Sequence, residues 1–289
     1  MWPTHTALSE NTAKLKNSTA MANVKFKSFS SGSCGNCYFI GLFSDEGQCE
    51  AGVLVDAGVS PRRVKKELAL DGLCFDDFQA MLITHDHLDH VRSLGSHCKH
   101  VGKPVWTTPT LHKALARHTM TGEFLGGCRH VMDEGWNEIV PGRIRARYFE
   151  VPHDATQTVG YAIQLDDYNF VIMTDLGRMT KQAMAFASQA HTVVIESNYD
   201  PYMLEHGPYP KELQDRIRDG HGHLSNGECS EAICSFRHES LKNVFMCHLS
   251  EHNNTPKLAM DSALNALGGR PDFRLAPLPR QTASPLMNL

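Results

Sequence analysis

The chain has 289 residues, a formal net charge of −4, 41% hydrophobic residues and 21% charged residues. These proportions are typical of a globular domain and exclude a disordered tail, a coiled coil and a fibre. The sequence contains no run of ~18 to 20 apolar residues that could span a bilayer, and its first twenty residues lack the apolar core of a signal peptide. We therefore expect a cytoplasmic protein with no membrane partner, whose nine scattered cysteines are free thiols.

The elements follow one another in a regular order. Residues 1–22 are polar and aperiodic, so we expect a disordered leader or an alternative start there, followed by a single domain over 23–289. Apolar, β-rich runs predict strands at 24–29, 37–43, 52–56, 80–84, 143–151, 158–165, 168–174, 191–196 and 243–248. Helical periodicity predicts helices at 61–70, 110–118, 178–189, 210–218, 226–239 and 255–267. Strands that first follow one another and then alternate with helices indicate an α/β domain of layered sheets covered by helices.

A cluster of polar side chains ends the apolar run 80–84 in a chain that contains 17 histidines. It reads His85-Asp86-His87-Leu88-Asp89-His90. His85 and His87 are two residues apart and can face one site, whereas Asp89 and His90 lie beyond the strand end and can turn toward a second metal. A solvated polar loop is the alternative, but three histidines and two aspartates within six residues favour a metal site.

This His-x-His-x-Asp-His motif resembles the signature of the metallo-β-lactamase family, and the resemblance extends from about residue 24 to the C-terminus. It implies a four-layer αββα fold in which two mixed sheets are sandwiched between helices. Asp56, in Leu54-Val55-Asp56-Ala57-Gly58, resembles the early aspartate that supports the metal loop of the family.

The resemblance also implies ligands for two divalent ions, zinc or manganese, with iron as a third candidate. His153 resembles the third histidine of the first metal, Asp175 the bridging carboxylate and His248 the last ligand of the second metal. Seen alone, an aspartate such as Asp175 is more often a helix N-cap, and a strand-end histidine such as His248 is more often a surface residue whose polar groups are satisfied. The implied assignment gives one ion His85, His87 and His153, the other ion Asp89, His90 and His248, and both ions Asp175.

Two of these residues favour one branch of the family over others. True β-lactamases have a cysteine where this chain has Asp175, whereas phosphodiesterase and glyoxalase branches use a bridging carboxylate. An iron-type redox branch replaces the second histidine by glutamate, so His87 favours hydrolysis.

Four further phrases resemble the YycJ/WalJ-type branch, whose members are described as metal-dependent 5′-to-3′ DNA exonucleases. They are Ser31-Gly32-Ser33-Cys34-Gly35-Asn36-Cys37, Glu196-Ser197-Asn198-Tyr199-Asp200, Gly222-His223-Leu224-Ser225-Asn226, and His248-Leu249-Ser250 with Asn253-Asn254. The resemblance implies substrate or phosphate contacts from Ser31, Gly32, Ser33, Asn36, His223, Ser225 and Asn226. The segment between Glu196 and His223 is too short for a large cap domain, so we expect an open substrate groove.

The implied reaction is hydrolysis of phosphodiester bonds in nucleic acid, with DNA as the expected partner. A hydroxide held between the two ions attacks phosphorus, Asp89 or Asp86 orients it or accepts its proton, and His223 contacts the scissile phosphate or protonates the leaving oxygen. One alternative is a hydrolase of a small thioester, lactone or cyclic nucleotide. Another is a non-catalytic nucleic-acid-binding protein whose metals are structural.

Two basic features are candidates for contacts with a nucleic-acid backbone. Arg143, Arg145 and Arg147 alternate along a predicted strand and share one face, and a second basic run, 62–66, opens a predicted helix. Solvated surface is the alternative for both features. The pair Cys34 and Cys37 lacks the second cysteine pair of a zinc site, so we assign it no redox or metal role.

Overall fold

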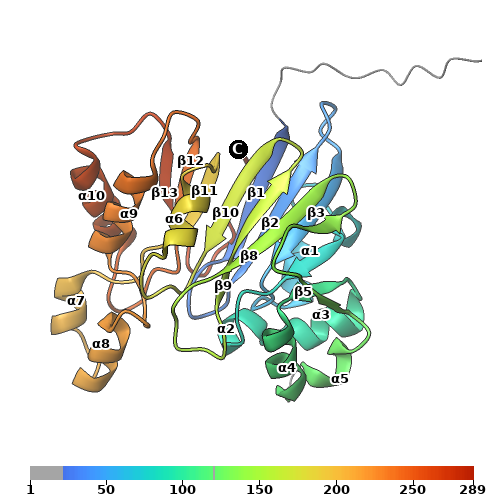
Figure 1. Ribbon diagram of the computed structural model, residues 1–289, viewed down its shortest axis with the longest axis horizontal. Helices are drawn as coiled ribbons and strands as arrows, with labels where there is room; N and C mark the ends of the chain where they lie inside the picture. Colours follow the sequence, from blue (N-terminus) through green and yellow to red (C-terminus); the bar gives the residue numbers. More distant parts are fainter. Residues whose placement is uncertain (1–21, 120) are drawn as a thin grey trace, which may run out of the picture.

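The computed structural model describes residues 22–119 and 121–289, so the expected leader lies outside the described residues except for Ala22. Two seven-stranded sheets form the centre of this part of the chain, and helices cover their outer faces (Figure 1). The first sheet has the order β14(Met287–Asn288), β1(Asn23–Ser30), β2(Cys37–Phe43), β3(Cys49–Val55), β4(Ala80–Leu82), β5(Val105–Thr107), β6(Arg129–Val131). The second has the order β13(Arg274–Pro277), β12(Asn243–Cys247), β11(Thr192–Glu196), β10(Tyr168–Met173), β9(Val159–Leu165), β8(Ile144–Glu150), β7(Asn137–Val140).

Both sheets are mixed. In the first sheet the strands from β14 to β3 pair antiparallel, and those from β3 to β6 pair parallel. In the second sheet the strands from β10 to β13 pair parallel, and those from β7 to β10 pair antiparallel. The predicted fold, two mixed sheets between helices, is therefore confirmed.

The helices form two outer layers. On the first sheet lie α1(Pro61–Ala69), the short 3-10 helix η1(Phe75–Asp77), α2(Leu88–Val91), α3(Leu94–His100), α4(Pro109–Arg117) and α5(Gly122–Leu125). On the second lie α6(Lys181–Ala187), α9(Asn226–Phe236) and α10(Pro256–Leu267), while α7(Pro201–His206) and α8(Lys211–Arg218) form a small pair beside them (Figure 1). Among the described residues, no helix has both the length and the apolar character that crossing a bilayer would need.

Local sequence accounts for the start of several helices. Ser60, Thr108 and Thr255 each accept a hydrogen bond from a backbone N–H of the first turn, and a proline follows each of them. The first backbone N–H groups of a helix have no acceptor within the helix. The capping hydroxyl accepts a hydrogen bond from one of them, and proline has no N–H, so these sequences favour a helix start at those points.

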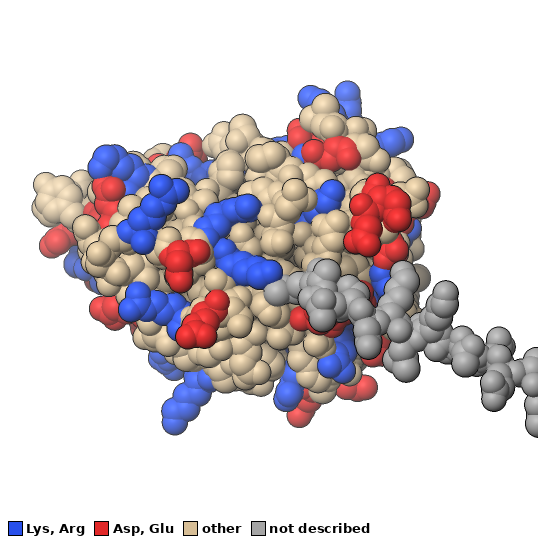
Figure 2. Space-filling model, turned by 90° about the horizontal axis from the view of Figure 1, so that it is seen from above, with Lys and Arg blue, Asp and Glu red and all other residues tan. Residues whose placement is uncertain are grey.

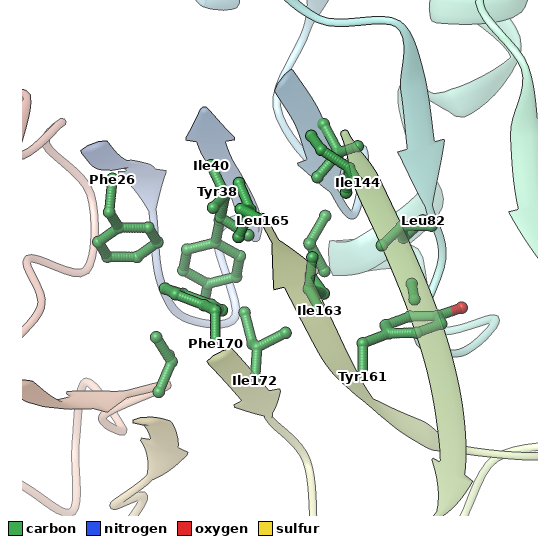
Figure 3. Close-up of a cluster of buried hydrophobic side chains, with 14 of the residues drawn as sticks. Phe26, Tyr38, Ile40, Leu82, Ile144, Tyr161, Ile163, Leu165, Phe170 and Ile172 are labelled. Carbon is green, nitrogen blue, oxygen red and sulfur yellow. The ribbon is translucent and has the colours of Figure 1, made fainter. Parts of the chain in front are cut away.

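The main core lies between the two sheets. Phe26 of β1 packs against Phe170 of β10 and Phe245 of β12, with ring centroids 5.5 and 5.3 Å apart. Figure 3 shows how Phe26 and Tyr38 from one sheet face Phe170 and Ile172 from the other. Because side chains alternate along each strand, the opposite faces of the same strands remain available to pack against the helices. This packing fixes the two sheets relative to each other and therefore fixes the strand ends that carry the polar motifs.

The loop after β3 passes very close to the polar motif that follows β4. A Cβ atom placed on Gly58 would lie 1.8 Å from the backbone oxygen of Asp89, which is well inside contact distance. Only glycine fits at this approach. Farther along the loop, the buried Nε2–H of His97 in α3 donates to the Val59 oxygen at 2.9 Å and anchors the loop on the helix layer.

The buried His97 predicts an acid-sensitive contribution to stability. Burial lowers the pKa of His97 from 6.5 to about 4. The unfolded chain therefore binds more protons than the folded chain between these pH values, so the free energy of unfolding falls as the pH is lowered through them, by on the order of 3 kcal/mol. Denaturant titrations at a series of pH values should show a smaller decrease for His97→Gln than for the unmodified chain. His100→Gln, at an exposed position of the same helix, is the control, and equal slopes for all three proteins would refute the assignment.

Candidate metal centre

The predicted ligands converge at one edge of the two sheets. His85 to His90 follow β4 and continue into α2, His153 follows β8, Asp175 follows β10 and His248 follows β12. Strands β8, β10 and β12 run in the same direction within their sheet, so their carboxyl ends lie at one edge. The residues that the sequence places far apart are thereby brought into one site.

Three residues at these strand ends have left-handed backbone conformations. The φ angles of Asp56, Asp175 and His248 are 61°, 55° and 54°. This conformation is uncommon for residues other than glycine and costs about 1–3 kcal/mol each when the surroundings impose it. The chain therefore bends abruptly one or two residues after each strand and directs a polar side chain toward the site.

A first group of histidines can hold a metal ion. One nitrogen from each of His85, His87 and His153 lies within 4.8 Å of the others. The Nε2 atom of His153 is 3.3 Å from Nδ1 of His87. His85 is fully buried, and its Nε2 atom has no hydrogen-bond partner among the described residues. An unpartnered buried nitrogen beside two further imidazoles is a suitable donor set for a divalent cation.

A second group lies beside the first. Asp89, His90 and His248 also bring one donor atom each within 4.8 Å. The carboxylate of Asp175 lies between the two groups, because one oxygen is 3.1 Å from Nε2 of His90 and the other is 3.8 Å from Nε2 of His153. The donors therefore fit two cations that share one carboxylate.

Asp56 contacts His90 on the side of the imidazole ring that faces away from the site. Its carboxylate is fully buried and lies 2.7 Å from Nδ1 of His90, and it accepts hydrogen bonds from the backbone and hydroxyl of Thr84. This contact leaves Nε2 of His90 for the site, as a hydrogen-bonded partner behind a ligand histidine commonly does. The position matches the supporting role predicted for Asp56.

Carboxylates dominate the electrostatics of the site. Burial disfavours the charged form of His90, but Asp175 and Asp56 outweigh burial and raise its pKa to about 10. The same balance between burial and Asp175 raises the pKa of His248 well above its usual range. Burial and the neighbouring His90 instead lower the pKa of His85 well below its usual range. The carboxylates thus retain protons on two of the histidines, and divalent cations can replace those protons.

Glu196 belongs to the site, although the sequence analysis gave it no role of its own. It is fully buried at the end of β11, and one carboxylate oxygen lies 2.7 Å from Nδ1 of His223 and 3.0 Å from Nδ1 of His248. The other oxygen accepts the backbone N–H groups of Leu176 and Leu224. In the sequence, the signal for this role was a charged residue at the end of the apolar run of β11. The signal was not sufficient, because the partners of Glu196 come from three other segments of the chain.

Only some of the predicted substrate contacts face the site. Ser33 and His223 line its cavity. The hydroxyl of Ser31 instead accepts the backbone N–H of His248, and the amide of Asn36 contacts both His90 and Asp89. These two residues support ligands from behind, and Gly32 donates its backbone N–H to Asn36.

The remaining predicted contacts are structural. Ser225 caps α9 in a reciprocal arrangement with Glu228, and Asn226 is buried against Ser197 and Asn254. Asp86 points away from the cluster, because both of its carboxylate oxygens accept hydrogen bonds from Thr156. Ser225, Asn226 and Asp86 are thus engaged within the protein and do not line the cavity, and their contacts with substrate stay a prediction.

The basic features also lie apart from the site, since none of their residues line the cavity. Arg143 pairs with Glu50 and Asp166, and Arg63 donates to the backbone oxygens of Phe29 and Gln281. Figure 2 shows the face of the molecule opposite to α2 and α8, where basic and acidic side chains are interspersed. That face has no field of a single sign.

A cavity of about 360 Å³ opens over the metal centre. The ligands His87, Asp89, His153, Asp175 and His248 form part of its wall, together with His223. Further lining residues come from α2 and its C-terminal cap, from Tyr209 and α8, and from loops, and α2 and α8 lie on opposite sides of the strand ends (Figure 1).

Comparison with known proteins agrees with this geometry. Residues 52–248 match the model of the β-lactamase superfamily domain. The exodeoxyribonuclease WalJ of Streptococcus pneumoniae (strain D39) is 29% identical over 270 residues, covering 92% of this chain and 98% of the relative. The exodeoxyribonuclease YycJ of Bacillus anthracis is 28% identical over 242 residues, covering 84% of this chain and 88% of the relative.

A solved structure gives the same result for the fold. The metallo-β-lactamase fold protein YhfI from Bacillus subtilis superposes with a TM-score of 0.64 at 14% identity, covering 91% of this chain and 99% of that chain. The chain therefore belongs to the β-lactamase superfamily and is a hydrolase of the metallo-β-lactamase fold.

Proposed function

We propose that this hydrolase cleaves phosphodiester bonds of nucleic acid and acts as a 5′-to-3′ exonuclease on DNA. The observation that carries the proposal is His223, which shares one cavity with the metal-ligand cluster and has its Nδ1 atom 2.7 Å from the buried Glu196. The two relatives named exodeoxyribonucleases support DNA as the substrate.

The ligand groups define where metals would bind. In this proposal one ion would be held by His85, His87 and His153, the other by Asp89, His90 and His248, and Asp175 would serve both. Zinc or manganese suits these nitrogen and oxygen donors, and iron is the third candidate. Two such ions activate water at neutral pH and neutralise charge on phosphate oxygens.

His223 has the geometry of a proton donor or phosphate contact. Glu196 accepts the hydrogen bond from Nδ1, which leaves Nε2 as the ring nitrogen available to the cavity. Burial disfavours the charged form of His223, but Glu196 outweighs burial and raises its pKa. His223 can therefore donate Nε2–H to a non-bridging oxygen or to the leaving oxygen of a phosphodiester. Asp89, whose carboxylate lies at the cavity, orients the attacking water in this proposal.

Two other functions use the same residues differently. A hydrolase of a small thioester, lactone or cyclic nucleotide needs the metals but no contacts with a nucleic-acid strand. A non-catalytic nucleic-acid-binding protein needs the metals only for stability. End-labelled single- and double-stranded DNA and RNA, incubated with the metal-loaded protein beside a thioester, distinguish the three. Stepwise shortening of DNA from the 5′ end is the expected result, and intact nucleic acids with hydrolysed thioester would refute the proposal.

The bridging position of Asp175 predicts a change in metal content. Asp175→Asn removes the shared carboxylate, so we expect bound metal, measured by elemental analysis after dialysis, to fall from about two ions to one or fewer. DNA hydrolysis should fall by more than the roughly 10–100-fold that substitutions behind a ligand cause. Asp166→Asn is a matched control, because Asp166 also has a left-handed conformation (φ 51°) but lies in the turn between β9 and β10. Unchanged metal content in Asp175→Asn would exclude the bridging role.

The position of His223 predicts a loss of turnover without loss of metal. His223→Ala should lower kcat for DNA by about 10²–10⁴-fold, the range typical of a proton donor, while bound metal remains at the level of the unmodified protein. His221→Ala, at an exposed position of the same loop, should retain activity. A fall in metal content that parallels the loss of activity would show instead that His223 is a ligand, as its place in a further group with Asp175, Glu196 and His248 would allow.

A further inference from the structure

One part of the cavity wall is apolar and has no place in the metal chemistry. Besides the candidate ligands, His223 and several polar residues, the cavity is lined by four apolar side chains, Leu88 on one helix and Tyr209, Leu213 and Ile217 on another segment. Hydrolysis of a phosphate group uses none of these four side chains. An apolar surface this close to charged ligands indicates that the substrate has an apolar part beside its phosphate.

Leu88 is the most exposed of the apolar side chains beside the metal ligands. It lies between His87 and Asp89 in the sequence, and 55% of its surface is exposed. A single exposed leucine is ordinary on a protein surface. Leu88, however, shares a cavity with three apolar side chains from a different part of the chain. A flat apolar group that entered the cavity would cover Leu88 and this second wall together.

The second wall belongs to the small helix pair α7 and α8. The pair has its own apolar cluster, in which Tyr209 and Leu213 pack against Tyr199, Leu204 and Ile217. The ring of His252 lies edge-on to Tyr209, with centroids 5.9 Å apart. The wall is therefore built by packed side chains rather than by a free loop.

An ion pair joins this helix pair to the metal centre. Arg216 of α8 pairs with Asp154, the residue that follows the ligand His153. Arg92, at the end of α2, also lines the cavity and donates to the backbone oxygen of Ser33. Positive groups thus stand on both sides of the apolar walls, where phosphates that flank a bound nucleoside would lie.

The size of the cavity limits what can occupy it. Its volume of about 360 Å³ lies at the lower end of the roughly 300–1,000 Å³ typical of small-molecule sites. It suits one nucleoside beside the metal centre and not a length of duplex. The four apolar side chains can cover the face of a base, and contacts of this kind tolerate any sequence.

We propose that this cavity binds the terminal nucleoside of a DNA strand, with its base between Leu88 and the wall of Tyr209, Leu213 and Ile217. This inference rests on the proposed nuclease function and adds the residues that select a strand end. The phosphodiester bond that joins this nucleoside to the strand then lies at the ligand cluster. Hydrolysis adds water across that bond and releases the terminal nucleotide.

The test uses two strands that differ only in the terminal base. One ends in an ordinary nucleotide, and the other ends in an abasic sugar phosphate. We expect the metal-loaded protein to remove the abasic residue with a kcat/KM lower by about 5- to 100-fold, the range that one base contact supplies. Leu88→Ala should lower kcat/KM for the ordinary end and remove most of this difference, and Leu88→Phe should restore it. The control is Leu70→Ala. Leu70 is the C-terminal cap residue of α1, and 71% of its surface is exposed.

A binding measurement keeps this inference separate from the nuclease proposal. A strand with 2-aminopurine at its end and phosphorothioate linkages against hydrolysis should change its fluorescence on binding to the full chain, because the terminal base leaves its neighbour in the strand and enters the cavity. The change should be smaller with Leu88→Ala, and an internal 2-aminopurine should respond less. A change that depends on Leu88 without any DNA turnover would retain the nucleoside site and reject the nuclease. Equal cleavage of both strand ends, or a fluorescence change that Leu88→Ala leaves intact, would overturn the inference.

Discussion

The burial of three carboxylates at one edge of the sheets is the constraint on which the site depends. Asp56, Asp175 and Glu196 are each almost fully withdrawn from water. A buried carboxylate is costly unless it is paired and hydrogen-bonded. Here each one contacts histidines, and the contacts hold His90 and His248 in fixed orientations. The same negative charge that stabilises protonated histidines attracts divalent cations, so the cost of burying the carboxylates and the capacity to bind metal have one physical origin.

The two sheets make this arrangement possible. The residues after β3, β10 and β12 have left-handed conformations, which are unfavourable in isolation. They persist because the strands before them are fixed by the core between the sheets and by the helices outside it. Because Gly58 has no side chain, the loop after β3, which carries Asp56, lies directly against the backbone of α2 at Asp89. Rigid strands followed by abrupt turns are a general way to hold ligands to within fractions of an ångström.

Much of this could be predicted from sequence, and the failures have physical causes. The long apolar strands, such as β2 and β9, and the longer helices, such as α1 and α10, were predicted because their signals are local. Strands β5, β6, β7, β13 and β14 have only two to four residues, and their pairing depends on neighbours that are distant in sequence. The ligand motif was predicted because its residue types and spacing are unusual. Glu196 was not assigned a role because its partners converge only in the fold, and Ser31 and Asn36 were expected at the substrate because sequence does not show that their side chains turn inward.

The proposed function depends on two metal ions that share Asp175 at the edge of the sheets. The most direct measurement is anomalous diffraction from crystals of the metal-loaded protein, collected on both sides of the absorption edge of the added metal. We expect two peaks, one among His85, His87 and His153 and one among Asp89, His90 and His248, with Asp175 in contact with both. A single peak, or a peak held by Glu196 and His223, would contradict this expectation.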